Sequence, residues 1–189
     1  MGAAASLDPT NRAVILLLDF AAAFPSIARA YLWEALKAVG FPSEVIRAIR
    51  ALYSNHFHFF SFLGTIRFAF TAFAGIRQGC PLSADIFVIV TDPINRALLL
   101  RIPRSGTLCA FADDLAIVLA HLWRGAPALA ILFARIALIT NLKLNQPKCL
   151  IIPLWRTVHL ELKALVREYI SIWADFSIGK CGKYLGFYV

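Results

Sequence analysis

The stretch TLCAFADDLAIVLA, residues 107–120, sets two apolar runs on either side of an adjacent pair of carboxylates, Asp113 and Asp114. Short apolar runs of this length suit the two strands of a hairpin, so we expect strands at 107–112 and 115–120 with the acids at the turn. The nearest basic residues in sequence are Arg104 and Arg124. A bound divalent cation would balance the pair, and hard cations such as Mg²⁺ prefer carboxylate oxygen. A solvated turn is the simpler alternative.

Composition favours one folded domain with a sizeable core. The chain has 189 residues, of which 60% are hydrophobic and 16% charged, which argues against disorder. The most apolar segment, residues 125–140, contains Arg135 and is shorter than the roughly 20 residues of a membrane-spanning helix. We therefore expect a buried helix there and no membrane, with a small membrane protein as a distant alternative. Residues 1–11 lack the basic start and apolar centre of a secretory signal.

The net charge indicates the kind of partner, and the cysteine content indicates the cellular compartment. The net charge of +8 fits a polyanionic partner such as nucleic acid. The four cysteines lie far apart, without a CxxC pair or zinc spacing, and are expected to be reduced in an intracellular protein: Cys80, Cys109, Cys149 and Cys181.

The first third of the chain predicts a strand, two helices and a hairpin. Residues 13–18 are wholly apolar and end at Asp19, as in a central strand with an acid at its carboxyl end. A helix N-cap is an equally good reading of Asp19. Helices follow at 27–39 and from Ser43, which we expect to act as the cap of the second helix. Ile46, Ile49 and Tyr53 form the apolar face of that second helix. Residues 57–73 suggest a hairpin around Gly64.

The segment GIRQGCPLS, residues 75–83, leads into an apolar helix that reaches about residue 100, with Pro81 in its first turn. Its two glycines would allow the backbone to approach a ligand, with Arg77 and Gln78 at the lip. A loop without a ligand would contain the same glycines. Further on we expect a helix at 126–140, a polar turn at 141–149 and a strand at 149–154. A helix at 157–170 and an aromatic strand at 183–189 complete the chain, and the helix should bury most of Leu160, Leu162, Leu165, Val166 and Tyr169.

Asp19, Asp113 and Asp114 together suggest a site for two divalent ions, which stabilise the attacking and leaving oxygens of an in-line phosphoryl displacement. A basic surface rich in aromatic side chains would hold nucleic acid through phosphate contacts and base stacking.

Five segments, in this order, resemble the motifs of the reverse transcriptase palm in LINE-type (non-LTR) retrotransposons. They are LLLDFAAAF (16–24), GIRQGCPLS (75–83), FADD (111–114), LKLNQPKC (142–149) and KYLGF (183–187). The chain departs from the family pattern at Ala22, Pro25 and Ala84, and none of these positions is a metal ligand.

The resemblance implies an α+β fold: a polymerase palm whose antiparallel sheet is flanked by helices, with the fingers and thumb largely missing. Residues 1–189 would then be a partial reverse transcriptase domain, the palm plus part of the fingers. A thumb and an endonuclease are expected on flanking sequence if the element is intact. The implied location is the nucleus.

The resemblance also implies RNA-directed DNA polymerase activity on an RNA template, a DNA primer and dNTPs, with two Mg²⁺ ions or Mn²⁺ as cofactor. Asp19, Asp113, Asp114 and the carbonyl of Phe20 would hold the metals, and Lys148 would approach the triphosphate and protonate the leaving pyrophosphate. The remaining implied residues are the sugar gate Phe24, the nucleotide and template contacts Arg77, Gln78 and Gly79, and the primer grip Tyr184, Leu185 and Gly186. An inactive remnant that binds nucleic acid and a group II intron maturase stay open as alternatives.

Overall fold

A five-stranded sheet forms the centre of the molecule in the computed structural model, which describes residues 12–54 and 57–189. In spatial order the strands are β4 (Thr107–Phe111), β5 (Asp114–Leu119), β1 (Val14–Leu18), β6 (Leu150–Pro153) and β7 (Ser177–Ile178). The first four run antiparallel to their neighbours, which confirms the expected sheet. β7 pairs with β6 in parallel and makes the sheet mixed. At two residues, β7 is too short to leave a periodic pattern in the sequence.

β1 is the middle strand, as predicted, and its side chains alternate between the two faces of the sheet. Val14, Leu16 and Leu18 belong to the main core. Leu17 belongs to a smaller cluster with Ala116 and Ile152 on the opposite face. Each face of β1 is therefore apolar, which explains the unbroken hydrophobic run in the sequence.

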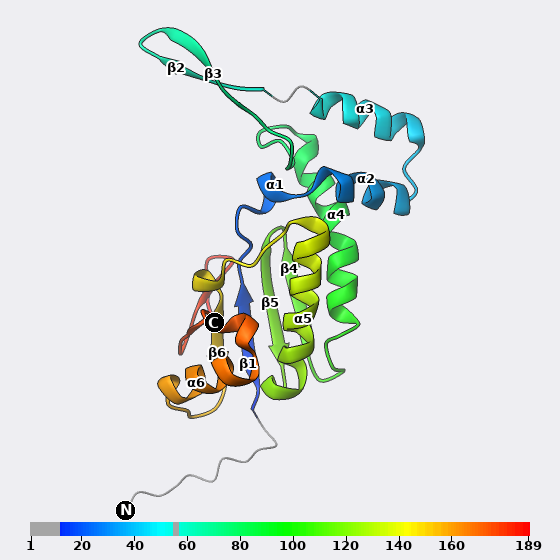
Figure 1. The fold of residues 1–189 in the computed structure, drawn as a ribbon. Helices are drawn as coiled ribbons and strands as arrows, with labels where there is room; N and C mark the ends of the chain where they lie inside the picture. Colours follow the sequence, from blue (N-terminus) through cyan, green and yellow to red (C-terminus); the bar gives the residue numbers. More distant parts are fainter. Residues whose placement is uncertain (1–11, 55–56) are drawn as a thin grey trace, which may run out of the picture.

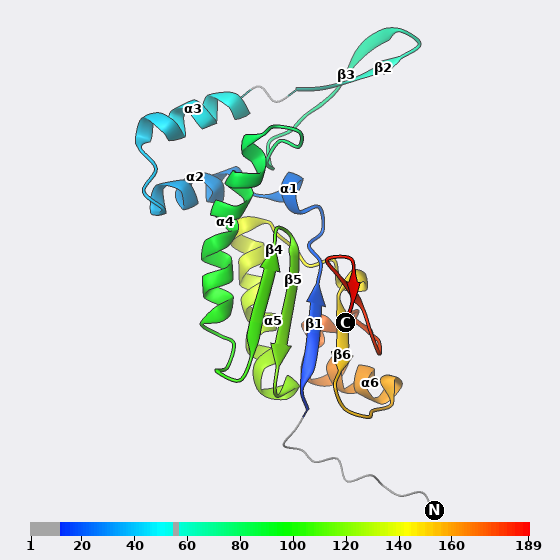
Figure 2. The same ribbon diagram turned by 180° about the vertical axis from the view of Figure 1, so that it is seen from behind.

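The helices lie mainly on one face of the sheet, and Figures 1 and 2 show the two sides. α5 covers that face, with α4 and α2 packed beside it, and the opposite face is open in Figure 2 except near the C-terminal hairpin. The helices are α1 (Ala23–Ser26), α2 (Arg29–Ala38), α3 (Ser43–Tyr53), α4 (Leu82–Leu99), α5 (Leu122–Thr140) and α6 (His159–Tyr169), with short 3₁₀ turns η1 (Gln146–Lys148) and η2 (Ser171–Trp173).

α5 begins four residues earlier than the sequence suggested, because His121 rather than a residue near 126 precedes its first turn. Within the described residues it is the single helix long and apolar enough to cross a membrane by length and composition. Leu129 and Phe133 are buried against the core, whereas Leu138 is 87% exposed. The expected burial therefore holds for the side of the helix that packs on the sheet.

Two predictions about the helices need correction. Ser43 was expected to cap α3, but Pro42 precedes the helix and the Ser43 hydroxyl donates to Glu44 instead, at 2.7 Å. The apolar face of α3 is as predicted, with Ile46, Ile49 and Tyr53 buried.

The second correction concerns α6, where the sequence suggested an inward face of five residues. Only Leu162 and Val166 are buried, while Leu160, Leu165 and Tyr169 are exposed. Residues four apart on a helix lie on one face, and α6 buries side chains along the line of Leu162 and Val166. Tyr169 stays exposed although its ring contacts that of Trp123, with centroids 5.8 Å apart.

Two hairpins extend the fold beyond the sheet. β2 (Phe57–Phe62) and β3 (Thr65–Thr71) project from the end of the molecule near α1 and α3 (Figure 1), and turn at Leu63 and Gly64, as predicted. The C-terminal segment was expected to be one strand, but it forms the hairpin β8 (Lys183–Tyr184) and β9 (Phe187–Tyr188). Leu185 and Gly186 take positive φ angles of 49° and 89°, which reverse the chain.

The C-terminal hairpin is fixed to the open face of the sheet. Tyr184 packs on the cluster of Leu17, Ala116 and Ile152. The backbone passes so close that a Cβ on Gly182 would lie 2.6 Å from side-chain atoms of Leu17 and Leu150. This contact brings the KYLGF segment to the same face as the acidic residues described next.

Candidate active site

Strand register brings Asp19 and Asp114 together. β1 and β5 pair as far as Leu18 and Leu115, so the next two residues across the pair of strands are Asp19 and Asp114. Side chains alternate along a strand, so both acids share the open face with Leu17 and Ala116. Opposite residues on neighbouring antiparallel strands have Cβ atoms about 4.5–5.5 Å apart. The two predicted catalytic acids are therefore neighbours, although nearly a hundred residues of sequence separate them.

Asp113 lies in the turn that precedes Asp114. Phe111 pairs with Asp114, so Ala112 and Asp113 form a two-residue turn, and the predicted acidic hairpin is confirmed. Ala112 has a φ of 52°, a left-handed conformation that costs a non-glycine residue about 1–2 kcal/mol. Ala22 and Leu185, in two of the other motifs, have similar φ angles of 51° and 49°. Backbone strain of this kind concentrates at functional sites.

The three carboxylates interact electrostatically. The pKa of Asp114 is raised, first by partial burial and then by the negative charges of Asp113 and Asp19. Their oxygens are suitable ligands for Mg²⁺, and a cation would relieve this repulsion. Across residues 12–54 and 57–189, however, no three His, Cys, Asp or Glu side chains are grouped as a set of metal ligands. The donor chemistry fits a divalent metal, while the side chains are not arranged around one.

A pocket of about 210 Å³ adds two lysines to this site. It is lined by Asp19, Asp114, Lys148, Lys183 and Tyr184, together with three leucines of β1 and β5. Sequence reasoning proposed Lys148 and missed Lys183. The available signal for Lys183 was its position directly before Tyr184 in the KYLGF segment.

Lys148 reaches the pocket because its segment is bound to the end of β1. The amide of Asn145 donates to the carbonyl of Asp19, and the amide of Ala21 donates to the carbonyl of Lys143, each at 2.8 Å. Phe20 lies between these bonds and is buried, with its ring centroid 6.3 Å from that of Phe133. The polar turn predicted at 141–149 thus places a lysine opposite the acids.

Cys149 is fully buried directly behind Asp19, whose carbonyl lies 3.7 Å from its Sγ. Burial, partly offset by the hydrogen bond to Asp19, raises the pKa of the Cys149 thiol to about 11. At pH 8 about one thiol in a thousand would then be ionised, and the thiolate is the reactive form.

We expect Cys149 to resist alkylation in the folded protein while the exposed Cys109 and Cys181 react. Iodoacetamide at pH 8 followed by peptide mass spectrometry measures this order. In denaturant all the cysteines should react alike. Rapid labelling of Cys149 in the folded protein would contradict its placement behind Asp19.

Phe24 and the 75–83 segment form a second group. The Phe24 ring stacks on Phe87 with centroids 4.2 Å apart, and its carbonyl accepts a hydrogen bond from the amide of Ile76 at 2.8 Å. The amide of Gly75 donates to the carbonyl of Ile27 at 2.7 Å. These bonds hold the loop against α1.

The predicted nucleotide and template residues are at the surface of this loop. Arg77, Gln78 and Gly79 are exposed, and the Ser83 hydroxyl donates to the carbonyl of Arg77. Arg77 and Gln78 line a pocket of about 310 Å³ with Pro25 and part of the β2–β3 hairpin. This pocket is distinct from the one that contains Asp19.

The predicted primer-grip residues divide between two places. Tyr184 lines the acidic pocket, and its pKa is raised by burial first, then by Cys109 and Asp114. Leu185 and Gly186 form the exposed turn of the C-terminal hairpin. Tyr184 is therefore the residue of the three that meets the acids.

Comparison with known proteins matches residues 4–189 to the family model described as reverse transcriptase (RNA-dependent DNA polymerase). The chain is 30% identical over 137 residues to the retrovirus-related Pol polyprotein from type-2 retrotransposable element R2DM of Drosophila melanogaster. That match covers 70% of this chain and 13% of the length of the polyprotein.

Solved structures of telomerase share the fold. The apo telomerase of Candida tropicalis, truncated from its C-terminal domain, aligns over 80% of this chain and 33% of its own, with a TM-score of 0.61 and 11% identity. Telomerase of Candida albicans, in complex with a fragment of telomeric RNA, aligns over 78% of this chain and 28% of its own, with a TM-score of 0.54 and 11% identity.

Proposed function

The chain belongs to the reverse transcriptase family, and on that basis we propose that it carries the palm active site of an RNA-directed DNA polymerase from a non-LTR retrotransposon. Members of this family use divalent metal ions and act on RNA templates. The proposal extends these properties to the residues of this chain. A DNA primer and dNTPs are the other proposed substrates, residues 1–189 are the proposed palm with part of the fingers, and the nucleus is the proposed location.

The placement of Asp19 and Asp114 in one pocket carries the proposal. Asp19, directly after β1, and Asp114, at the start of β5, line one pocket with Lys148, and a third carboxylate, Asp113, lies in the turn that precedes Asp114. Asp19, Asp113 and Asp114 would hold two Mg²⁺ ions, or Mn²⁺, with the carbonyl of Phe20 as a further ligand. When bound, such ions neutralise charge on the attacking and leaving oxygens of a phosphoryl transfer.

The two lysines would give the pocket groups that bind phosphate and donate a proton. Lys148 contacts the triphosphate and donates a proton to the leaving pyrophosphate, since an ammonium group can both pair with phosphate and release a proton. Lys183, on β8, adds a second positive charge to the lining of the pocket. Tyr184 supports the primer end from the C-terminal hairpin, and the turn of Leu185 and Gly186 completes the primer grip.

The loop beside Phe24 selects the incoming nucleotide. Arg77, Gln78 and Gly79 form the floor for the nucleotide and the template base. Phe24 is the sugar gate, and its stacking on Phe87 fixes the ring in place. A fixed ring can exclude the 2′-hydroxyl of a ribonucleotide, whereas a mobile one would move aside.

We expect Phe24→Ala to raise the use of ribonucleotides relative to deoxynucleotides by at least about 10-fold. A pocket that distinguishes two substrates by one small group typically changes the ratio of their kcat/KM values by about 10–200-fold, or about 1–3 kcal/mol. A rigid ring would give at least the lower figure. Single-nucleotide extension with matched rNTP and dNTP, by a protein that contains this chain and extends a primer, measures the ratio. An unchanged ratio in a folded variant would leave Phe24 as a packing residue for α4.

The rival function is nucleic-acid binding without catalysis, and one observation favours it: the carboxylates of the described residues are not grouped as metal ligands. Binding through the net charge of +8 alone would weaken steeply with salt and would survive loss of Asp19. The substitution of Asp19 considered in the Discussion separates the two functions, because only catalysis depends on that carboxylate.

A further inference from the structure

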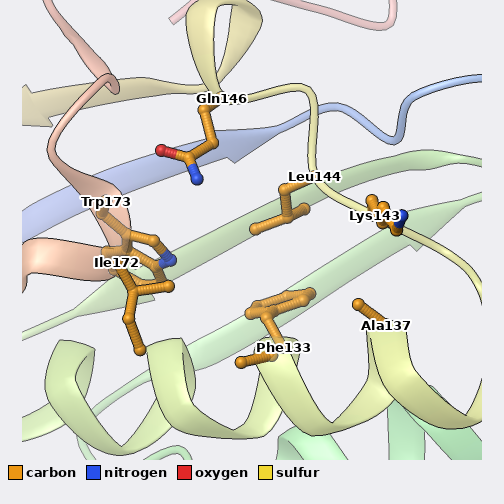
Figure 3. A pocket seen from close by; sticks show the side chains of 8 residues that line it. Phe133, Ala137, Lys143, Leu144, Gln146, Ile172 and Trp173 are labelled. Atoms are coloured by element: carbon orange, nitrogen blue, oxygen red, sulfur yellow. The ribbon is translucent and has the colours of Figure 1, made fainter.

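A third pocket, of about 250 Å³, opens between α5, the 143–146 segment and η2. It lies on the helix side of the sheet, whereas the acids lie on the open face. Figure 3 shows Phe133 below, Ile172 and Trp173 at one end, and Leu144 and Gln146 above. None of these residues takes part in the proposed polymerase site, so the pocket needs its own explanation.

Trp173 supplies the observation that points to a ligand. The side chain is 1% exposed, and its Nε1 has no hydrogen-bond partner among the described residues. One face of the indole is covered by Phe176, with centroids 4.8 Å apart. The indole nitrogen is turned toward the pocket (Figure 3). A buried N–H group is destabilising unless an acceptor meets it, so this donor indicates an acceptor inside the pocket.

The remaining walls define the shape and polarity of that ligand. Phe133, Ala134, Ala137 and Leu144 are apolar, whereas the amide of Gln146 offers a donor and an acceptor. Lys143 is exposed at the rim. An uncharged ring with polar edge atoms suits the interior, because burying a charge is costly, and the lysine suits an anionic group outside. The volume is slightly below that of a drug-sized site, which limits the ring system to one or two fused rings.

We infer that this pocket binds the base of a 5′-phosphorylated nucleotide: the Trp173 indole donates to a base acceptor, the Gln146 amide pairs with the base edge, and Lys143 contacts the phosphate. The source is a free mononucleotide or the 5′ end of a strand. The inference does not depend on the proposed polymerase activity, because it uses residues on the other face of the sheet.

Calorimetric titration of the 189-residue chain with adenosine monophosphate, in EDTA to suppress metal-dependent binding, tests the inference. We expect saturable binding at one site and an affinity about 3- to 10-fold weaker in Trp173→Phe, which keeps an aromatic side chain but loses the N–H donor. Lys143→Gln should lower the affinity for the monophosphate to that for adenosine. Trp123→Phe is the matched control, since Trp123 Nε1 is also buried and unpartnered within the described residues but lines a different pocket.

A filling substitution gives an independent check if Trp173→Phe does not fold. Ala137→Leu, on α5, should abolish binding by occupying the pocket. Tighter binding of a 5′-phosphorylated dinucleotide than of the mononucleotide assigns the site to a strand end, and the reverse assigns it to the free nucleotide. Absent binding, an equal effect of Trp123→Phe, or loss of binding in Asp19→Asn would overturn the inference. Loss of primer extension in Asp19→Asn with nucleotide binding intact would leave it standing.

Discussion

Replacing Asp19 or Asp114 with asparagine is expected to reduce primer extension at least about 100-fold, in a protein that contains this chain and extends a primer. Removing one group that stabilises charge in a transition state commonly costs a factor of 10²–10³. Each substitution keeps the shape of the side chain and removes its charge. Extension of a labelled primer on an RNA template with Mg²⁺ measures the loss, and near-normal extension by either variant would exclude the metal-binding role.

The same substitutions should leave folding intact, which separates a catalytic role from a structural one. The pKa of Asp114 lies above its ordinary value of 3.8, so the folded state holds this proton more tightly than the unfolded state does. The resulting stabilisation is present at low pH and is lost as the pH rises from 3.8 through the raised pKa. Urea denaturation at several pH values should show that Asp114→Asn lacks this decline. Asp175→Asn, at an exposed aspartate, is the control and should retain both extension and the decline.

Gly75→Ala, which adds one methyl group, should lower the free energy of unfolding more than the same change at the other glycine of the 75–83 segment. Gly75 has a φ of 84°, and a Cβ there would lie 2.4–2.6 Å from backbone atoms of Pro25. The left-handed conformation costs about 1–2 kcal/mol and an overpacked contact about 1–3 kcal/mol, so the expected loss is about 2–5 kcal/mol. Backbone atoms cannot move aside as a flexible side chain can. Urea denaturation measures the change.

Gly79→Ala is the matched control for that prediction. Gly79 has nearly the same φ, 82°, but a Cβ there would have no heavy atom within 4 Å. We expect only the conformational cost of about 1–2 kcal/mol. Equal losses at the two positions would mean that the contact with Pro25 contributes nothing. A larger loss at Gly75 would show that the loop and α1 are held at a fixed distance, which the proposed selection by Phe24 requires.

The parts of the fold that were predictable are those whose residues meet a single, regular environment. β1 is apolar at every position because its residues alternate between the main core and the smaller cluster on the opposite face. The FADD hairpin is marked by two polar residues between apolar strands. The sequence of α6 suggested a wider buried face than the helix has, because more of its residues are apolar than are buried. The C-terminal hairpin was missed because its turn contains Leu185 in a conformation that favours glycine or asparagine.

The candidate site also has features that the sequence predicts and features that it does not. Asp19, Asp113 and Asp114 could be proposed from the sequence because they adjoin apolar runs and stand in segments that resemble reverse transcriptase motifs. That Asp19 faces Asp114 follows from strand register, which depends on pairs of residues far apart in sequence. The position of Lys183 in the acidic pocket and the pocket beside Trp173 both depend on the packing of separate segments. No local sequence pattern predicts them.

The order of the strands also sets the timing of folding. Val14, in the middle strand, pairs with Leu119 on one side and with Pro153 on the other. On a ribosome, β1 emerges long before either partner exists, and the sheet cannot close until β6 has been synthesised. Pairings this distant in sequence slow folding, and unpaired apolar strands promote aggregation meanwhile. The sheet therefore forms only after β6 has been synthesised, and a chain that stops before β6 would contain the acidic hairpin without a complete sheet behind it.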